Sequence, residues 1–402
     1  KPMKTQSTYL DFDDKTAILA LWYIVNTSLS AFTKLTTHFG DAKQALIAEL
    51  SQWQALGLHQ KHLARWQDGA DVLAFVEKIY HGQTIGNFGL VFLGEKTYPK
   101  QLLDIYDPPP MLFYQGNVKR LFDKQIAIVG SRKPTPHAEK TTFDIAQYLA
   151  YFGLTITSGL AGGIDKMAHL GALSQPDTQQ GRTIGVLGTG IDVCYPKNHH
   201  ALYAQIIHEG GCLVSELLPT TPASKHTFPR RNRLVAGLSM ATLVVEAAMQ
   251  SGSLITARLT AEQGKQVFCV PSLIDNINAQ GCHHLIREGA TLIYHPEQIL
   301  EDLSVLDKTL TPLKSDIAKN PENITIKNQI YQQTTRQNTA VKEVEIAQHL
   351  QVVWENLSSI PCDLDNLVLA TNLDTASLLA NLLELEILGL IYTVGGRYAR
   401  LS

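Results

Sequence analysis

The chain has 402 residues, of which 45% are hydrophobic and 18% charged, and its formal net charge is −3. This length and composition exclude an intrinsically disordered protein and predict two or three globular domains. No apolar run reaches the roughly 18 residues that a membrane-spanning helix needs. The amino terminus does not resemble a signal peptide, so we expect a cytoplasmic protein.

The cysteine pattern predicts neither a disulfide framework nor a structural zinc site. The chain contains five cysteines and no CxxC pair, whereas both kinds of site need paired spacing. The only cluster of metal-ligand residue types is Cys282-His283-His284. Because adjacent residues rarely converge on one ion, we expect no metal and no cofactor.

Residues 1–85 are predicted to form a small helical domain. Helical spacing covers 14–25, 30–39 and 41–50, and Gly40-Asp41 supplies a stop followed by a cap. Its own small core should contain Trp53, Leu56, Leu58, Leu63 and Trp66. The pattern resembles a SAM-like module, and a structural cap on the next domain is an equally open interpretation. The polar stretch 81–89 marks the boundary.

Residues 86–303 are predicted to form an α/β domain with a doubly wound, Rossmann-like parallel sheet. The prolines at 99 and 108–110 indicate turns and extended segments leading into it. Helical segments at 138–152, 165–174, 198–209 and 253–264 then alternate with short apolar strands. The expected strands are 126–129, 154–157, 184–187, 212–215, 241–245, 266–270 and 291–294.

Polar residues 304–340 indicate a linker, and 341–402 are predicted to form a winged-helix domain. Helices are expected at 364–370 and 374–388, followed by a hairpin of 391–394 and 398–401 around Gly395-Gly396. This last domain carries three Lys/Arg and eight Asp/Glu. A winged helix that binds duplex DNA usually presents a basic helix. We therefore expect this one to contact protein, or DNA only weakly.

The turn Gly130-Ser131-Arg132 follows the first strand of the predicted sheet. Backbone N–H groups at such a turn suit an anion, and Arg132 can donate two hydrogen bonds to a phosphate. A nicotinamide dinucleotide would require G-x-G-x-x-G here and an acid about 20 residues later. The turn has only Gly130, and no acid follows the second strand until Asp165. The dinucleotide interpretation is therefore not supported.

Further tight turns are expected near the same pocket, where backbone can approach a ligand closely. They contain Gly159, Gly162, Gly163, Gly188, Gly190, Ser251 and Gly252. We expect Asp165 and Asp192 to cap helices, and Ser251 and Ser253 to cap the helix that begins near Leu254. The sequence contains no phosphate-binding P-loop, and no G-x-S-x-G or H-E-x-x-H motif frames a catalytic residue.

The strongest local signal is a basic segment with an aromatic residue, lying in a stretch without Asp or Glu between Leu217 and Val245. Cations can follow the phosphates of a single strand while Phe228 stacks on a base. The predicted ligands of single-stranded DNA are Gly130, Ser131, Arg132, Lys225, Phe228, Arg230, Arg231, Asn232 and Arg233. The alternatives are a solvated basic loop, or arginines that tie the fold together through Glu216 or Glu246.

Taken in order, these motifs resemble the DNA-processing protein A family (DprA, also called Smf). The resemblance rests on GSR at 130–132, SGLAGGIDKMAH at 158–169, GTGIDVCYPKN at 188–198, FPRRNRLVAGLS at 228–239 and VVEAAMQSGSLITA at 244–257. It implies a cytoplasmic, non-enzymatic homodimer that binds and protects incoming single-stranded DNA in natural transformation and loads the RecA recombinase. The family's pocket arginine, lysine and aromatic fall on Arg132, Lys225 and Phe228. This chain departs from the family pattern at His283 and Ser272.

Two other functions stay open. One is a nucleotide hydrolase of the Lonely-guy phosphoribohydrolase type, which also uses glycine-rich turns on a doubly wound sheet and would need Glu246 as its catalytic acid. The other is a structural adaptor, in which the basic segment only mediates self-association.

Overall fold

The computed structural model describes residues 8–175, 181–306, 346–358, 362–394 and 397–400. Contacts divide the chain into two compact units. Lys1–Pro134 and Thr141–Leu303 belong to the first, and Thr135–Lys140 and Ser304–Ser402 belong to the second. The amino-terminal helices and the large sheet therefore share one unit.

Six described helices precede the sheet: α2(Asp14–Ile24), α3(Leu29–Phe39), α4(Ala42–Ile47), α5(Leu50–Ala55), α6(Gln60–Gln67) and α7(Gly69–Thr84). The predicted stop and cap are present, because Gly40 has φ +98° and Asp41 accepts from the amide of Gln44 at 2.7 Å. Trp53 and Trp66 stack with ring centroids 5.4 Å apart in the core. The predicted boundary stretch 81–89 contains the last turn of α7, a turn at 85–87 and the first residue of the first strand, Gly89.

The sheet has nine strands in the order β1-β2-β6-β5-β4-β3-β7-β8-β9. Its seven parallel strands match the predicted ones: β3(Gln125–Gly130), β4(Thr155–Ser158), β5(Thr183–Val186), β6(Cys212–Ser215), β7(Ala241–Val245), β8(Gln266–Cys269) and β9(Thr291–Leu292). The order reverses at β3, which pairs with both β4 and β7. Such a switch point is where ligands bind in open α/β sheets.

Two antiparallel strands extend one edge of the predicted parallel sheet. β1(Gly89–Phe92) pairs with β2(Met111–Gly116), and β2 adds to β6. The prolines between them occupy the connection, which contains the short helix η1(Lys100–Leu103). A second short helix, η2(Val118–Phe122), leads into β3.

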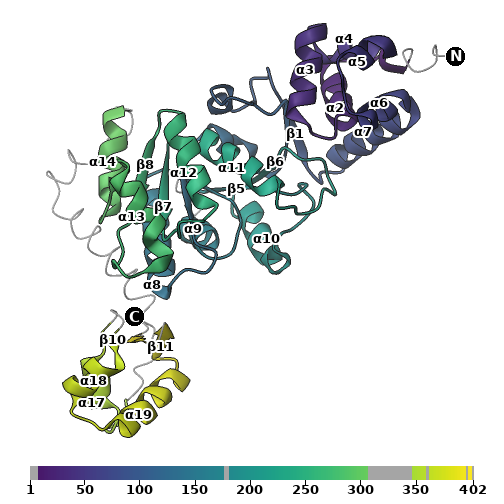
Figure 1. Ribbon diagram of the computed structural model, residues 1–402. Coiled ribbons are helices and arrows are strands. Elements are labelled where there is room, and N and C mark those ends of the chain that lie inside the picture. The colour runs from purple at the N-terminus through teal and green to yellow at the C-terminus, as the bar shows by residue number, and fades with distance from the viewer. Residues whose placement is uncertain (1–7, 176–180, 307–345, 359–361, 395–396, 401–402) are drawn as a thin grey trace. The chain divides into compact units, whose positions relative to one another are not determined.

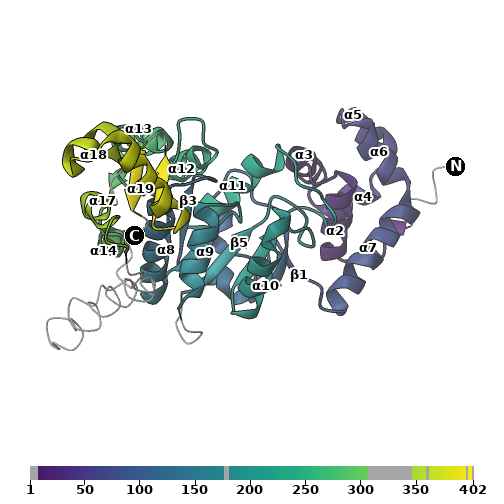
Figure 2. The ribbon, with the colours of Figure 1, turned by 90° about the horizontal axis from the view of Figure 1, so that it is seen from below.

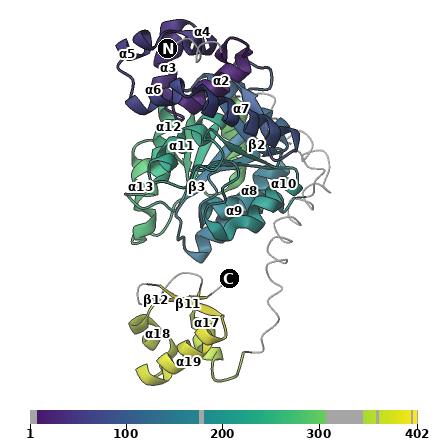
Figure 3. The same ribbon diagram turned by 90° about the vertical axis from the view of Figure 1, so that its right-hand side faces the viewer.

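Helices cover both faces of the sheet, as the doubly wound prediction requires. The views in Figure 2 and Figure 3 place α8(Pro136–Tyr151), α9(Ile164–Leu173) and α10(His200–His208) on one face. They place α11(Thr227–Leu238), α12(Ser253–Glu262) and α13(Gln280–Arg287) on the other. The 3-10 turns η3(Lys197–His199) and η4(Ile277–Ala279) precede α10 and α13, and α14(Pro296–Leu306) follows β9.

The amino-terminal helices pack at the β1 end of the sheet (Figure 1). Their buried residues form one continuous cluster with sheet residues such as Phe113 and Leu213. The indole of Trp22 is fully buried and donates to the backbone carbonyl of Glu216 at 2.9 Å. The helical module is thus fixed to the sheet by apolar burial and by a specific hydrogen bond.

The carboxy-terminal residues form the predicted winged helix. It contains α17(Gln351–Asn356), α18(Leu364–Thr371), α19(Thr375–Ile387) and a three-stranded sheet of β10(Cys362–Asp363), β12(Arg397–Arg400) and β11(Ile391–Val394). Its core is a separate cluster built on Leu367, Leu378, Leu382 and Leu385. Gly395-Gly396 and nearly all of the predicted linker lie outside the described residues.

No helix in the described part of the chain combines the length and the hydropathy needed to cross a bilayer. Among those same residues, no three His, Cys, Asp or Glu side chains are grouped to hold a metal ion.

Candidate nucleic-acid interface

Two hollows lie beyond the carboxyl ends of β3, β4 and β5, at the switch point of the sheet. The smaller has a volume of about 140 Å³ and the larger about 640 Å³. They share the lining residues Arg132, Gly159, Ala161, Tyr195, Phe228 and Arg231. The structure therefore brings together turns that the sequence spreads over about 100 residues.

The turn after β3 is built on Gly130, which has no room for a side chain. A Cβ there would fall 1.9 Å from the carbonyl oxygen of Val245 on the neighbouring strand. The hydroxyl of Ser253, at the start of α12, donates to the Gly130 carbonyl at 2.7 Å. The turn is thus held between two strands and a helix, and it presents Arg132 to solvent.

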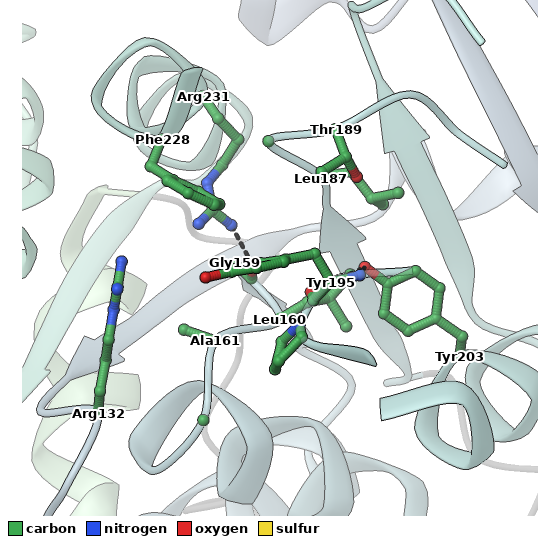
Figure 4. Close-up of a pocket in the computed structure, with 13 residues that line it drawn as sticks. Arg132, Gly159, Leu160, Ala161, Leu187, Thr189, Tyr195, Tyr203, Phe228 and Arg231 are labelled. Atoms are coloured by element: carbon green, nitrogen blue, oxygen red, sulfur yellow. Dashed lines mark hydrogen bonds between the residues drawn. The ribbon is translucent and has the colours of Figure 1, made fainter. Parts of the chain in front are cut away.

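Arg132 and Phe228 face each other across the hollows, as Figure 4 shows. The guanidinium carbon of Arg132 lies 5.6 Å from the centroid of the Phe228 ring. The Tyr195 ring lies 5.3 Å from Phe228, centroid to centroid. A Cβ at Gly188 would lie 2.7 Å from Phe228 Cδ1, so glycine is what lets this ring sit over the β5 turn. Cation and aromatic form one site.

Lys225 is exposed and lines the larger hollow. In the described part of the chain, neither Lys225 nor Arg132 makes an ion pair. The charged residues that line the larger hollow are three cations, Arg132, Lys225 and Arg231, and one carboxylate, Asp165. This excess of positive charge favours an anionic ligand.

Most of the basic segment lies on a helix, which differs from the alternative of a solvated basic loop. α11 begins at Thr227, so Phe228 lies in its first turn. Arg230 and Arg233, three residues apart, turn to the same carboxylate, whereas Arg231 turns to backbone carbonyls.

Arg230 and Arg233 bind Glu216, and neither lines a hollow. The Glu216 side chain is 2% exposed, and Arg230 Nε donates to it at 2.8 Å. Arg230 also lies over the Trp22 ring, 5.5 Å from its centroid. Arg230 and Arg233 thus match the alternative in which arginines stabilise the fold through Glu216.

Arg231 is buried and holds the turns of two adjacent strands. Its guanidinium donates to the carbonyls of Gly159, after β4, and Val186, on β5, the latter at 2.7 Å. Burial lowers the pKa of Arg231, while Asp165 acts in the opposite direction. Asn232 donates to the carbonyl of Gly252 at 3.3 Å and lines the larger hollow.

Of the remaining residues predicted to form tight turns, some line the hollows and others only shape the backbone nearby. Gly159, Gly162, Gly188, Ser251 and Gly252 line one or both hollows. Gly163 and Gly190 do not. Gly163 is the N-cap of α9 with φ +71°, and a Cβ on Gly190 would meet the carbonyl of Leu218 at 2.6 Å.

The expected caps differ in detail. Asp165 lies inside the first turn of α9 and accepts from the amide of Ala161 at 3.3 Å. Asp192 accepts from the amide of Thr220 at 2.6 Å and so joins two loops. Ser251 accepts from the amide of Ser253 at 3.2 Å, whereas the Ser253 hydroxyl binds the turn after β3.

Glu246, the catalytic acid of the hydrolase alternative, lines neither hollow. It is 3% exposed, has φ +49°, and accepts from the side-chain amide of Asn276 at 2.9 Å. Asn276 also donates to the Ser272 hydroxyl, and the His283 ring lies 3.1 Å from the Ser272 carbonyl. The two departures from the family pattern therefore touch each other.

Comparisons of the sequence and of the fold find similar proteins. A family model described as DNA recombination-mediator protein A matches residues 89–304, and a DprA winged helix domain model matches 339–397. Protein Smf of Escherichia coli K12 is 38% identical over 315 residues, which cover 78% of each chain. DNA processing protein DprA of Streptococcus pneumoniae R6 is 43% identical over 209 residues, covering 52% of this chain and 72% of that protein. The X-ray structure of DprA from Streptococcus pneumoniae is similar with a TM-score of 0.61 and 32% identity, covering 71% of this chain and 97% of that one.

Proposed function

Since the chain belongs to the DprA/Smf family of DNA recombination-mediator proteins, we propose that it binds single-stranded DNA in the hollows at the sheet's switch point. It would protect incoming DNA in the cytoplasm during natural transformation. The observation that carries the proposal is the pairing of an exposed arginine with a half-buried aromatic ring, 5.6 Å apart, at a glycine-lined turn.

Each part of this site suits one part of a single strand. Arg132 and Lys225 supply charge for phosphates, and Phe228 offers a ring on which an unpaired base can stack. Gly188 leaves the space that the Phe228 ring occupies, and Gly159 leaves the space that the Arg231 guanidinium occupies, so both glycines help to form the site. None of these contacts reads a base edge, so binding should depend on single-stranded character and not on sequence.

Fewer basic residues are free to contact phosphates than the sequence of the basic segment predicts. Arg230 and Arg233 are engaged by Glu216, and Arg231 by backbone carbonyls. We therefore assign the direct contacts to Arg132 and Lys225 and give the three arginines of α11 a supporting role.

The proposal includes a homodimer. Apolar side chains are exposed at the β9 end of the sheet, in the segment after β8, on β9 and just after β9: Leu273, Ile274, Ile277, Leu292 and Tyr294. Ile274 is 93% exposed. Exposed apolar side chains gathered at a sheet edge suit burial against a second copy.

Recombination mediation would follow from holding the strand while RecA assembles on it. The support for RecA is the family membership. It can be tested by comparing the rate of RecA filament assembly on single-stranded DNA with wild-type protein and with Arg132→Ala. The wild type should accelerate filament assembly, and Arg132→Ala should not.

We propose that the protein acts on DNA by binding it and not by catalysing a reaction. The hydrolase alternative needs a carboxylate facing the ligand, and Glu246 is turned to Asn276. Release of free base from a nucleoside monophosphate, abolished by Glu246→Ala, would contradict the account.

The direct test of base stacking is to measure oligo-dT binding by Phe228→Leu and Phe228→Tyr. Loss of a stacked base costs about 1–3 kcal/mol, so Phe228→Leu should bind roughly 5- to 150-fold more weakly. Phe228→Tyr keeps the ring and should bind like the wild type. Equal affinity of wild type and Phe228→Leu would remove the stacking role.

A further inference from the structure

The helix α19 of the winged helix is apolar on two faces. One face is buried in the domain core through Leu378, Leu382 and Leu385. The other carries Leu379, Leu383 and Ile387, which are 41%, 59% and 77% exposed. A surface helix normally has one apolar stripe, so the second stripe lacks an explanation within this domain.

The three exposed side chains, which we call the α19 stripe, form a continuous surface. They are spaced four residues apart, which places them on one side of the helix over about 12 Å. Ala376 and Ala380 are also exposed and add no polar group to it. A row of this kind is what a partner helix packs against through i, i+4 contacts.

The charges beside the stripe argue against duplex DNA as its occupant. From Asp374 to Gly396 the sequence contains no Lys or Arg, so α19 cannot neutralise phosphates. Glu384 and Glu386 are exposed on the same helix. Glu384 lies 2.9 Å from His349, and Glu386 makes no ion pair among the described residues.

The same charges argue against a second copy of this domain. Residues 341–402 carry three Lys/Arg and eight Asp/Glu, so two copies joined through α19 would bring like charges together. Like-charge juxtaposition disfavours an interface, whereas opposite charge at the rim favours it. An apolar helix flanked by cations would match both the α19 stripe and the carboxylates beside it, Glu384 and Glu386.

We propose that the α19 stripe is a docking site for an amphipathic helix of another protein, with Lys or Arg flanking its apolar face. Apolar contacts with the stripe supply most of the affinity, and Glu386 selects the basic flanks. The winged helix is then a protein-recruiting module whose action does not depend on DNA in the hollows of the sheet.

The test uses the full chain and three synthetic helical peptides of about five turns. The first has leucines along one face and lysines elsewhere, the second replaces the lysines with glutamates, and the third replaces the leucines with serines. Binding is measured by fluorescence anisotropy at physiological salt. The proposal expects the first peptide to bind at least tenfold more tightly than either of the others.

Variants then locate the binding. Leu379→Gln/Leu383→Gln keeps good helix formers and should weaken the first peptide at least tenfold. Glu386→Lys leaves the apolar surface intact and should weaken it several-fold. Leu369→Gln is the matched control, since Leu369 is 80% exposed on α18, and it should bind like the wild type.

Three results would overturn the proposal. The first is that the wild type fails to discriminate among the peptides. The second is that the double variant binds the first peptide as tightly as Leu369→Gln does. The third is that the double variant changes the oligomeric state in sedimentation, or loses duplex DNA binding that the wild type has, because the stripe would then be covered by a second copy or by DNA.

Discussion

His169 is a fully buried imidazole on α9. Its Nδ1 lies 2.6 Å from the hydroxyl of Thr183, which itself donates to the carbonyl of Ile156. Since the Thr183 hydroxyl hydrogen is used in this way, the ring donates from Nδ1. Burial, with help from the nearby His199 and Arg231, lowers the pKa of His169 to about 3.

This histidine should make the protein acid-sensitive. The unfolded chain binds a proton at His169 near pH 6.5, and the folded chain does so only near pH 3. Stability is therefore lost as the pH falls through this window, by about 2 kcal/mol between pH 7 and pH 5. Urea unfolding at both pH values should show this loss in the wild type and a smaller one in His169→Gln. Equal losses would mean that another group carries the acid sensitivity.

At the residue scale, the sequence predicted the types of side chain at the site better than their individual partners. Arg132, Lys225 and Phe228 meet at the hollows because each follows or opens an element at the same edge of the sheet. Arg230 and Arg233 do not, because their direction depends on the rotation of α11 and on Glu216, which lies at the end of another strand. Spacing along the chain does not contain that information.

At the scale of elements, α11 joins the site to the amino-terminal module. Its first turn carries Phe228, and its middle is anchored by two arginines on the buried Glu216. The backbone of Glu216 accepts the indole N–H of Trp22. The position of the stacking ring therefore depends on an ion-pair network that does not itself face the ligand.

Replacing Glu216 with glutamine should affect both stability and binding. Removing one partner of a buried ion pair leaves the other uncompensated and costs about 3–5 kcal/mol. Glu216→Gln should therefore unfold at lower urea than the wild type, and its folded form should bind oligo-dT more weakly. Glu262→Gln, an exposed glutamate on α12, is the control and should change neither. Unchanged stability of Glu216→Gln would show that the network does not anchor α11.

Two elements that the sequence pattern did not predict, β2 and α11, share a cause. Prolines at 108–110 lie just before β2, and Pro229 lies in the first turn of α11. Proline is tolerated at a helix's first turn and next to an edge strand, but its presence concealed both elements. The seven parallel strands were predictable because their apolar, β-branched runs are short and separated by helical periodicity.

At the scale of the whole molecule, the homodimer proposal predicts a specific effect of charge at the β9 end of the sheet. Ile274→Glu places a carboxylate where an apolar contact is expected, so it should shift the protein from dimer to monomer in sedimentation velocity. Leu103→Glu is the matched control, because Leu103 is another exposed apolar residue, 53% exposed on η1. This variant should stay dimeric. A wild type that is monomeric at micromolar concentration, or dimeric Ile274→Glu, would exclude this surface.

Fluorescence anisotropy with labelled oligo-dT over a salt series tests directly whether Arg132 and Lys225 hold the phosphates of single-stranded DNA. It compares the wild type, Arg132→Ala, Lys225→Ala and the control Lys61→Ala, a lysine exposed on α6. Each lost phosphate contact should weaken binding and reduce the log–log salt slope by about 0.7. We predict the weaker binding and the smaller slope for Arg132→Ala and Lys225→Ala but not for Lys61→Ala. We also predict that a matched duplex binds the wild type more weakly than oligo-dT does. Slopes equal to that of Lys61→Ala, or a wild type that does not bind oligo-dT, would contradict the account.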